Sequence, residues 1–162
     1  MSNEMKVEDV ITGNVKSCRP EANLSQVAAL MWDYDFGAMP VVDDENRVMG
    51  IINDRDIAIA AATKGRLATE INIGEVVSGN VYACAFDENV NSALKSMRRE
   101  RVRRLPVIGG AGKLAGILSI NDIVLRAGDA KGKRAPEIPY EDVISTFKAV
   151  CEHSRASQAV VA

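Results

Sequence analysis

Two stretches of the chain place apolar residues at the spacing of an amphipathic helix, with polar residues between them. The segments are NLSQVAALMWDYD and NVNSALKSMRRER, and Asn23 and Asn89 stand where an N-cap belongs. The apolar positions are Leu24, Val27, Ala28, Leu30 and Met31 in the first stretch and Val90, Ala93, Leu94 and Met97 in the second. The pattern therefore predicts two helices, each with one face turned toward a core.

Short apolar runs bounded by turn residues predict the strands. A short strand is expected before each helix, at Val15–Cys18 (VKSC) and at Val81–Cys84 (VYAC). After each helix, the segments MPVVDDENRVMGIIN and LPVIGGAGKLAGILS are typical of a strand, a turn and a second strand. The turns are expected at Asp43–Asn46 and Gly109–Gly112, where the residues that favour turns are found.

A closing helix is expected after each of these hairpins, in DRDIAIAAATKG and in INDIVLRAG, ended by Gly65 and Gly128. Each unit then reads strand–helix–strand–strand–helix, over residues 7–66 and 71–128. Two such units predict one α/β (α+β) fold in which the sheets pack on the helices.

The two units are copies of one pattern. Residues 7–58 align without a gap with residues 73–124, at the offset that separates Gly50 from Gly116. The identical pairs include Val10/Val76, Gly13/Gly79, Cys18/Cys84, Asn23/Asn89, Met31/Met97, Pro40/Pro106, Gly50/Gly116 and Asp56/Asp122. An internal repeat of this kind needs its sibling to cover its apolar face.

The character of the chain changes after the second repeat. Residues 129–139 are charged and contain Pro and Gly, which is typical of a linker. Residues 140–154 then predict a C-terminal helix. Its apolar stripe, which must be buried on the body or on a second subunit, consists of Val143, Ile144, Phe147, Val150 and Cys151.

Composition narrows the class of protein. Apolar residues make up 47% of the 162, aromatic residues 4% and charged residues 26%, with a net charge of −2. This balance favours a globular domain with an aliphatic core and gives no overall attraction to nucleic acid. The first residues, MSNEMKVEDV, do not resemble a secretory signal, and no apolar run approaches the roughly 20 residues that span a bilayer. We therefore expect a cytoplasmic protein with no membrane partner.

Candidate chemistry is sparse. Cys18 and Cys84 are expected to be buried thiols of the strands, and with the single His153 they make no metal site. There is no set of nucleophile, base and orienting residue, so the chain is not expected to be an enzyme. The stretch GGAGK (Gly109–Lys113) lacks the spacing of a phosphate-binding loop and is interpreted as the hairpin turn.

The repeated motifs carry a resemblance to a known family. FGAMPVVD followed by GIINDRDI, and VRRLPVIG followed by GILSINDI, resemble the cystathionine β-synthase (CBS) domain, which occurs as a tandem pair. The combination of DRDI, KG, VRRLPV and a short C-terminal helix is similar to bacterial stand-alone CBS pairs. The resemblance covers residues 7–125.

The resemblance implies a regulatory, adenine-nucleotide-binding module with clefts between the two repeats. It implies as ligand AMP, ADP, ATP, S-adenosylmethionine or NAD(H), with no cofactor required. It also implies a homodimer that reports to a protein target of unknown identity. The alternative is a dimerisation or interaction scaffold whose clefts are vestigial.

Two sets of ligand-binding residues follow from the resemblance. One cleft would join Asn53 and Asp56 to Ser78, Asn80, Val81, Tyr82, Arg103 and Arg104. The other would join Ser119 and Asp122 to Thr12, Asn14, Val15, Gly37 and Ala38. In each, a carboxylate accepts the ribose hydroxyl protons and a helix N-terminus faces phosphate.

The opposite walls of the two clefts differ. Arg103 and Arg104 stand where the first repeat has Gly37 and Ala38, and a guanidinium binds phosphate through two donors. We therefore expect the Asp56 cleft to take the phosphorylated end of a nucleotide, and the Asp122 cleft to be empty, weaker or suited to a less charged adenosyl group.

The neighbouring cations have open interpretations. Arg55 either joins the phosphate contacts or is an exposed charge on the first helical turn. In KSMRRERVRR, the residues Lys95, Arg98 and Arg101 are interpreted as a solvated helix face, and no nucleic-acid partner is expected.

Overall fold

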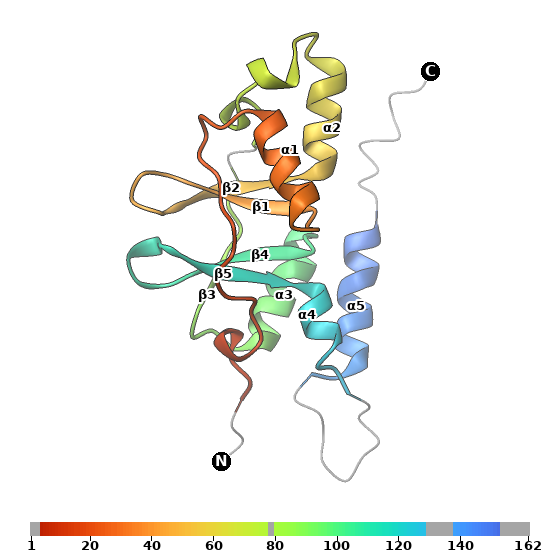
Figure 1. The fold of residues 1–162 in the computed structure, drawn as a ribbon. Coiled ribbons are helices and arrows are strands. Elements are labelled where there is room, and N and C mark those ends of the chain that lie inside the picture. Colours follow the sequence, from red (N-terminus) through yellow and green to blue (C-terminus); the bar gives the residue numbers. More distant parts are fainter. Residues whose placement is uncertain (1–3, 78–79, 129–137, 153–162) are drawn as a thin grey trace. The chain divides into compact units, whose positions relative to one another are not determined.

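The computed structural model describes residues 4–77, 80–128 and 138–152. The helices are α1 (Leu24–Asp33), α2 (Asp54–Thr63), α3 (Val90–Glu100), α4 (Ile120–Val124) and α5 (Tyr140–Cys151). The strands are β1 (Ala38–Val42), β2 (Val48–Asn53), β3 (Cys84–Ala85), β4 (Arg104–Ile108) and β5 (Leu114–Ser119) (Figure 1). Helices and small sheets are mixed as the repeat pattern predicts, so the α/β class is confirmed. Within the described residues, no helix has the length and apolar character needed to cross a bilayer.

The chain divides into two compact units that do not coincide with the two repeats. We call them the first-repeat unit (Gly13–Ala83 and Pro106–Gly116) and the second-repeat unit (Met1–Thr12, Cys84–Leu105 and Ile117–Ala162). Each unit thus takes a segment from outside its own repeat.

Backbone hydrogen bonds hold these two exchanged segments. In the second-repeat unit, the Val7 amide donates to the Glu88 carbonyl at 2.8 Å. In the first-repeat unit, the Leu114 amide donates to the Asn46 carbonyl at 2.9 Å. Each exchanged segment therefore satisfies backbone groups of the unit that receives it.

The first-repeat unit is built on α1 and the β1–β2 hairpin. Asn23 caps α1 by accepting from the Gln26 amide at 2.9 Å, and the Gln26 side chain accepts from the Asn23 amide at 3.0 Å. The strands β1 and β2 are antiparallel, with Ala38 opposite Asn53. The core of the unit contains Cys18, Leu24, Val27, Met31, Met39, Val41, Ile52, Ile57, Ala60, Ile71 and Ile73.

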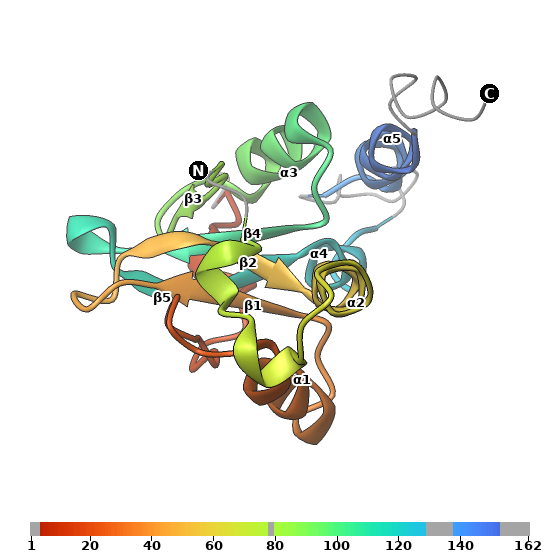
Figure 2. The same ribbon diagram turned by 90° about the horizontal axis from the view of Figure 1, so that it is seen from above.

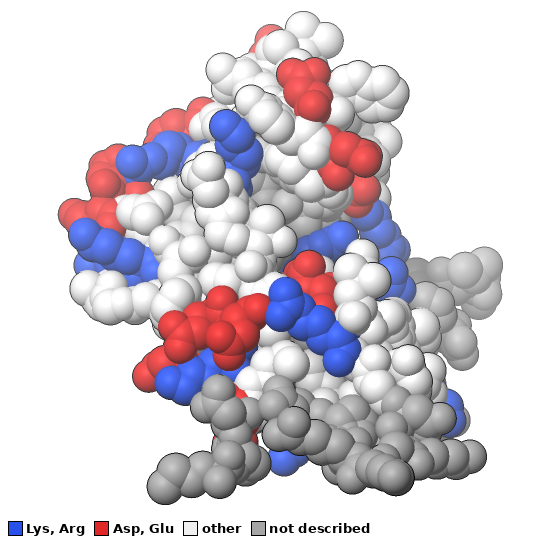
Figure 3. Space-filling view, turned by 60° about the horizontal axis from the view of Figure 1, so that its bottom comes forward, with Lys and Arg blue, Asp and Glu red and all other residues white. Residues whose placement is uncertain are grey.

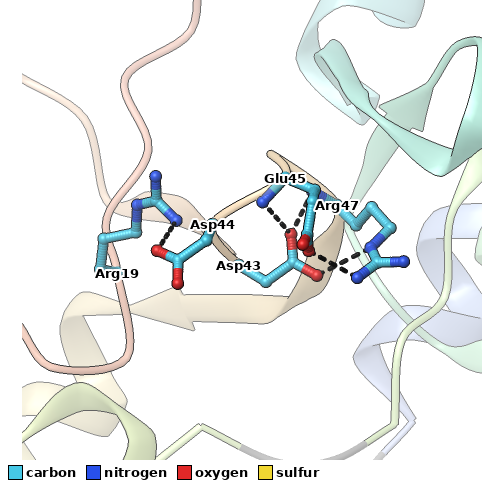
Figure 4. A network of polar contacts seen from close by, with 5 residues as sticks. All are labelled: Arg19, Asp43, Asp44, Glu45 and Arg47. Atoms are coloured by element: carbon cyan, nitrogen blue, oxygen red, sulfur yellow. Dashed lines mark hydrogen bonds and ion pairs between the residues drawn. The ribbon is translucent and has the colours of Figure 1, made fainter.

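The turn between β1 and β2 is held by a polar network (Figure 4). The Asp43 carboxylate accepts from the Arg47 amide at 2.8 Å and from the Arg47 guanidinium at 2.8 Å. Backbone and side-chain hydrogen bonds from Arg47 keep the pKa of Asp43 below its usual value. Arg47 also pairs with Glu45 at 2.6 Å, and Arg19 pairs with Asp44 at 2.9 Å. These contacts define the end of the hairpin.

The second-repeat unit contains the helices α3, α4 and α5, the strand β3, the start of β4 and the end of β5. The helix α5 packs against α3 and α4 (Figure 2). The buried apolar residues of this unit include Val90, Ala93, Leu94, Met97, Leu105, Leu118, Ile120, Ile123, Ile138 and Val143.

The predicted first strand does not form in the first repeat and is shorter than predicted in the second. Val15–Cys18 forms no strand, and Cys18 makes one isolated bridge to Val41. The backbone turns just before it, where Asn14 has a φ of 55° in the left-handed region. In the second repeat, β3 covers Cys84–Ala85 alone. The prediction of buried thiols is confirmed for Cys18 and Cys84.

The closing helices differ in length. The helix α2 ends at Thr63, and Gly65 then has a φ of 64°, as the C-terminal glycine predicts. The helix α4 stops at Val124, short of Gly128, because the Arg126 amide bonds the Ile123 carbonyl at 3.0 Å in a tighter turn.

The turn interpretation of GGAGK is confirmed. Residues Gly110–Gly112 form a short turn between β4 and β5, with Ala111 at a φ of 59°. This segment belongs to the hairpin and forms no phosphate-binding loop.

The predicted apolar stripe of the C-terminal helix is only partly buried on the body of the protein, and burial of the rest on a second subunit stays a prediction. Val143 is buried, but Ile144 is 53% exposed, Cys151 is exposed, and the fully buried side chain is Thr146. On the inward face of α5, Arg98 donates to the Thr146 hydroxyl at 3.3 Å and to a backbone carbonyl of the helix. The inward face of α5 therefore carries a polar contact that a count of apolar positions does not reveal.

Arg98 also corrects the interpretation of the basic run. The expectation of a solvated helix face fits Lys95 and Arg101, which are exposed. Arg98 is half-buried and makes two hydrogen bonds to α5, at Thr146 and at the Asp142 carbonyl. It is a structural contact between two helices.

Candidate ligand-binding site

The first candidate group surrounds the start of α2. Asn53 ends β2 and caps the helix, accepting from the Asp56 amide at 2.8 Å through its side-chain oxygen. Ala38 lies opposite Asn53 in the hairpin, and the Asp54 amide donates to the Gly37 carbonyl at 3.1 Å. The hairpin therefore holds Gly37 and Ala38 next to the cap of α2.

The second candidate group surrounds the start of α4 in the same way. Ser119 ends β5 and caps the helix, accepting from the Asp122 amide at 3.2 Å. The Ile120 amide donates to the Arg103 carbonyl at 2.9 Å, and Thr12 bridges Ile117 of β5. Arg103 and Thr12 are therefore held near Ser119 in the second-repeat unit.

The two aspartates differ in what their carboxylates do. The Asp122 carboxylate accepts from the Ser119 amide at 2.9 Å and from the Ser119 hydroxyl at 2.7 Å, which completes a capping box. The half-buried Asp56 carboxylate makes no hydrogen bond or ion pair within the residues that the structure describes. Asp56 is thus the more available acceptor.

The chemistry of the two caps explains this difference. A serine hydroxyl both donates and accepts, so Ser119 can bond the helix amide and the carboxylate together. Asn53 accepts from the Asp56 amide through its side-chain oxygen, and its donor is the separate amide nitrogen, which makes no hydrogen bond to the Asp56 carboxylate within the described residues.

The candidate phosphate-binding cations have free guanidinium groups. Arg103 is exposed and Arg104 is half-buried, and across the described part of the chain neither guanidinium makes a hydrogen bond or an ion pair. Arg55 is exposed in the same way on the first turn of α2. By contrast, Arg98 pairs with Asp142 of α5, and Arg101 pairs with Glu152, the residue that follows α5.

The remaining predicted residues lie on the surface of the units. Thr12, Asn14 and Asn80 are exposed, and Val15 is half-buried. Val81 and Tyr82 are exposed although they are apolar. Ser78 lies outside the described residues.

The structure thus brings together some of the predicted residues at the start of α2 and some at the start of α4. Asn53, Gly37 and Ala38 come together, as do Ser119 and Arg103. The expected opposition of Asp56 to the arginines, and of Asp122 to Gly37, joins different units and stays a prediction.

The sequence did not predict two grooves of the first-repeat unit. A groove of about 580 Å³ is lined by Ser17, Cys18, Arg19, Ala22, Gln26, Val27, Ala29, Leu30 and Asp33. A second, of about 300 Å³, lies between α1 and α2 and is lined by Ala28, Met31, Trp32, Phe36, Asp54, Ile57 and Ala58. In the sequence, the second groove could have been inferred from Trp32, a large apolar residue beside the predicted helical stripe. Its side chain is 88% exposed.

Charged side chains of both signs lie in small groups on the face drawn in Figure 3. Among the residues that the structure describes, no group of three or more His, Cys, Asp or Glu side chains could hold a metal ion. The charged groups of the candidate site are therefore the carboxylates of Asp56 and Asp122 and the guanidinium groups of Arg103 and Arg104.

Comparison with known proteins gives a consistent result. The family model described as CBS domain matches residues 7–63 and 73–128. An uncharacterized 17.7 kDa protein of Acidianus ambivalens is 32% identical over 143 residues, which cover 86% of this chain and 85% of that protein.

Two solved structures have the same fold. The crystal structure of Hypoxic Response Protein I with two coordinated zinc ions has a TM-score of 0.69 at 28% identity, covering 75% of this chain and 98% of that one. The CBS domain pair of protein MJ0100, in complex with 5′-methylthioadenosine and S-adenosyl-L-methionine, has a TM-score of 0.68 at 23% identity, covering 75% and 94%.

These matches cover both copies of the internal repeat. They also span the hairpins and helix starts that carry Asp56 and Asp122. The chain belongs to the CBS domain family and contains a tandem pair of these domains.

Proposed function

We propose that the protein is a regulatory module that binds an adenosine-type ligand in clefts between its two CBS repeats. The observation that carries the proposal is the pair of aspartates, Asp56 and Asp122, at matched positions where a capped helix follows a strand. The ligands in the MJ0100 structure, two adenosyl compounds bound to a CBS pair, support this class of ligand.

The Asp56 cleft is the principal site of the proposal. Its carboxylate is half-buried and free, so it can accept both hydroxyl protons of a ribose. Arg103 and Arg104, whose guanidinium groups are also free, would bind the phosphates of AMP, ADP or ATP from the opposite wall. Asn80, Val81 and Tyr82 complete this predicted wall, with Ser78.

The Asp122 cleft is the weaker site of the proposal. A ribose hydroxyl must displace the Ser119 hydroxyl from the Asp122 carboxylate, where it donates at 2.7 Å. That exchange replaces one hydrogen bond with another and so leaves little net gain. Gly37 and Ala38 on the predicted opposite wall supply no cation, which fits a less charged adenosyl group.

Ligand binding acts through a population shift between arrangements of the protein, and a homodimer relays the shift to a protein target. No chemical step is part of this proposal. The alternative, an interaction scaffold with vestigial clefts, has the same fold and differs in having no adenosine affinity.

A thermal-unfolding series tests the proposal, with AMP, ADP, ATP, S-adenosylmethionine and NADH as ligands. A ligand at 100 times its Kd stabilises the folded chain by about 2.7 kcal/mol. For a chain of this size the expected rise in Tm is about 5–10 °C. If none of the five raises the Tm at millimolar concentration, the scaffold function is correct.

Two variants locate the site. Asp56→Ala is expected to abolish the shift produced by the best nucleotide, and Asp122→Ala to leave most of it. The reverse result would show that the principal cleft contains Asp122.

A further inference from the structure

The helix α5 is fixed on the second-repeat unit by polar contacts along its length. Just before the helix, the Gly128 amide donates to the Ile138 carbonyl at 3.0 Å. In its middle, Arg98 donates to the Thr146 hydroxyl and to the Asp142 carbonyl. Figure 2 shows α5 along its axis, beside the helices α3 and α4 against which it packs. One face of α5 is therefore committed to this unit, and this sets the position of the opposite face as well.

The opposite face of α5 carries exposed apolar side chains. Tyr140 is 52% exposed and Ile144 is 53% exposed. Cys151 is exposed as well, and Phe147 is half-buried. Spacings of three, four and seven residues place these side chains along one stripe of the helix. Because burial of apolar area is favourable, the stripe favours contact with another apolar surface.

Two residues of opposite charge lie beside this stripe. Glu141 and Lys148 are exposed, and in the described part of the chain neither side chain makes a hydrogen bond or an ion pair. They are two helical turns apart on the same side of Ile144, about 10 Å along the axis. They are thus too far apart to pair with each other, and both are available to another molecule.

The stripe and the two charges are self-complementary when a second α5 runs antiparallel with Ile144 at the centre. In a two-fold contact, residue i of one copy meets residue j of the other, and j meets i. Glu141 lies three residues before Ile144 and Lys148 four residues after it, so each glutamate meets a lysine of the other copy. On the other side of the stripe, Tyr140 lies four residues before Ile144 and Phe147 three after it, so the aromatic side chains meet in the same way. In a parallel pair, the charged side of each helix would face the aromatic side of the other.

We propose that the outward face of α5 is an interface with a second copy of this chain, in which the two α5 helices pack antiparallel. Ile144 packs against Ile144 of the second copy, with two pairs of Tyr140 and Phe147 on one side and two ion pairs of Glu141 and Lys148 on the other. The occupant is a second copy because a single α5 supplies both halves of the charge pattern. The inference rests on the homodimer of the proposed function and names one of its contact faces.

Disulfide trapping tests this contact, whatever other surfaces the two copies share. The variant Ile144→Cys is made together with Cys151→Ser, which leaves the buried Cys18 and Cys84 as the other thiols. Mild oxidation should link two copies of Ile144→Cys at least tenfold faster than the matched control Ser145→Cys, an exposed position about 100° further around the helix. The native chain should not be linked through Cys151, because antiparallel helices hold these two thiols about 20 Å apart.

Charge reversal identifies the occupant. In the Ile144→Cys background, Glu141→Lys alone or Lys148→Glu alone sets like charges opposite each other at two places. Each change should slow the linkage about tenfold at low salt. The double variant restores both ion pairs with their signs exchanged, so it should recover the original rate.

Several results would overturn this inference. These are linkage of Ile144→Cys no faster than of Ser145→Cys, linkage of the native chain through Cys151, or a double reversal as slow as the single changes. Maleimide labelling of Ile144→Cys detects another occupant, since protection that is independent of protein concentration would show a segment of the same chain over α5.

Sedimentation of the native chain separates this inference from the proposed function. A dimer whose Ile144→Cys variant is not linked would retain the homodimer and reject this face of α5. A monomer would reject both. The thermal shift with nucleotide is measured independently of either result.

Discussion

Ser119 donates both its amide and its hydroxyl to the carboxylate of Asp122, at 2.9 and 2.7 Å. At the matching position of the first repeat, Asn53 makes no such contact with the Asp56 carboxylate. Two residues that the sequence aligns as equivalents therefore have different roles. Asp122 is committed to its own helix, and Asp56 is available to a ligand.

The stability of the two variants should reflect this difference. Asp122→Ala removes the capping box of α4, so it should lower the free energy of unfolding by about 1 kcal/mol more than Asp56→Ala does. Chemical denaturation of both variants without ligand measures the difference. Equal losses would mean that the bonds between Ser119 and Asp122 add nothing to stability.

Arg104→Ala should weaken the binding of a nucleotide but not of adenosine. A hydrogen bond between two charged groups is worth about 1.5–3 kcal/mol, which is a loss of about 10- to 100-fold in affinity. Calorimetric titration with AMP and with adenosine separates the two effects. Lys95→Ala, a loss of an exposed cation elsewhere on the chain, serves as the control. Equal weakening of both ligands would disprove the phosphate role of Arg104.

Arg98→Ala should destabilise the contact between α3 and α5. The change leaves the buried Thr146 hydroxyl with one partner fewer and removes a donor from the Asp142 carbonyl, which costs about 1–3 kcal/mol. Hydrogen exchange of the α5 amides and chemical denaturation measure the loss. The matched control is Arg99→Ala, because Arg99 is exposed and pairs with the adjacent Glu100. A loss as large in Arg99→Ala would show that Arg98 has no special role.

The three cysteines should differ in reactivity. Burial raises the pKa of Cys18 to about 11 and that of Cys84 to about 12, so both stay protonated thiols in the folded protein at pH 8. Cys151 is exposed. A colorimetric thiol reagent should therefore modify one thiol in the native protein and three after unfolding. Rapid modification of Cys18 or Cys84 without denaturant would contradict the buried positions.

The same two thiols predict a pH dependence. Their pKa values in the folded state are raised above the unfolded value of about 8.5, so the folded state holds these protons more tightly. The stability that this provides is present below pH 8.5 and is lost as the pH rises toward 11. Cys18→Ala and Cys84→Ala should each reduce the alkaline loss measured by denaturation between pH 8 and 11.

Much of the fold followed from the sequence because the signals were local. The helical spacing of Leu24, Val27 and Met31, the cap at Asn23 and the turn at Asp43–Asn46 each depend on neighbours a few residues away. The repeat then linked two local patterns into one family assignment. The positions of Asp56 and Asp122 at helix starts came from the same signals.

The remaining features depend on segments far apart in the chain. The Val7 amide finds the Glu88 carbonyl, and Arg98 finds Thr146, through hydrogen bonds that no local pattern encodes. The burial of Thr146, and the groove where α1 residues such as Trp32 meet α2 residues such as Ile57, likewise depend on residues that are distant in the sequence.

By itself, the sequence determined the repeat, its helices and hairpins, and the two matched aspartates, because periodicity and caps act over a few residues. Only the tertiary structure decided which carboxylate is free, which face of α5 is buried and which groove is open. These features depend on donors and acceptors that meet only after distant segments pack together.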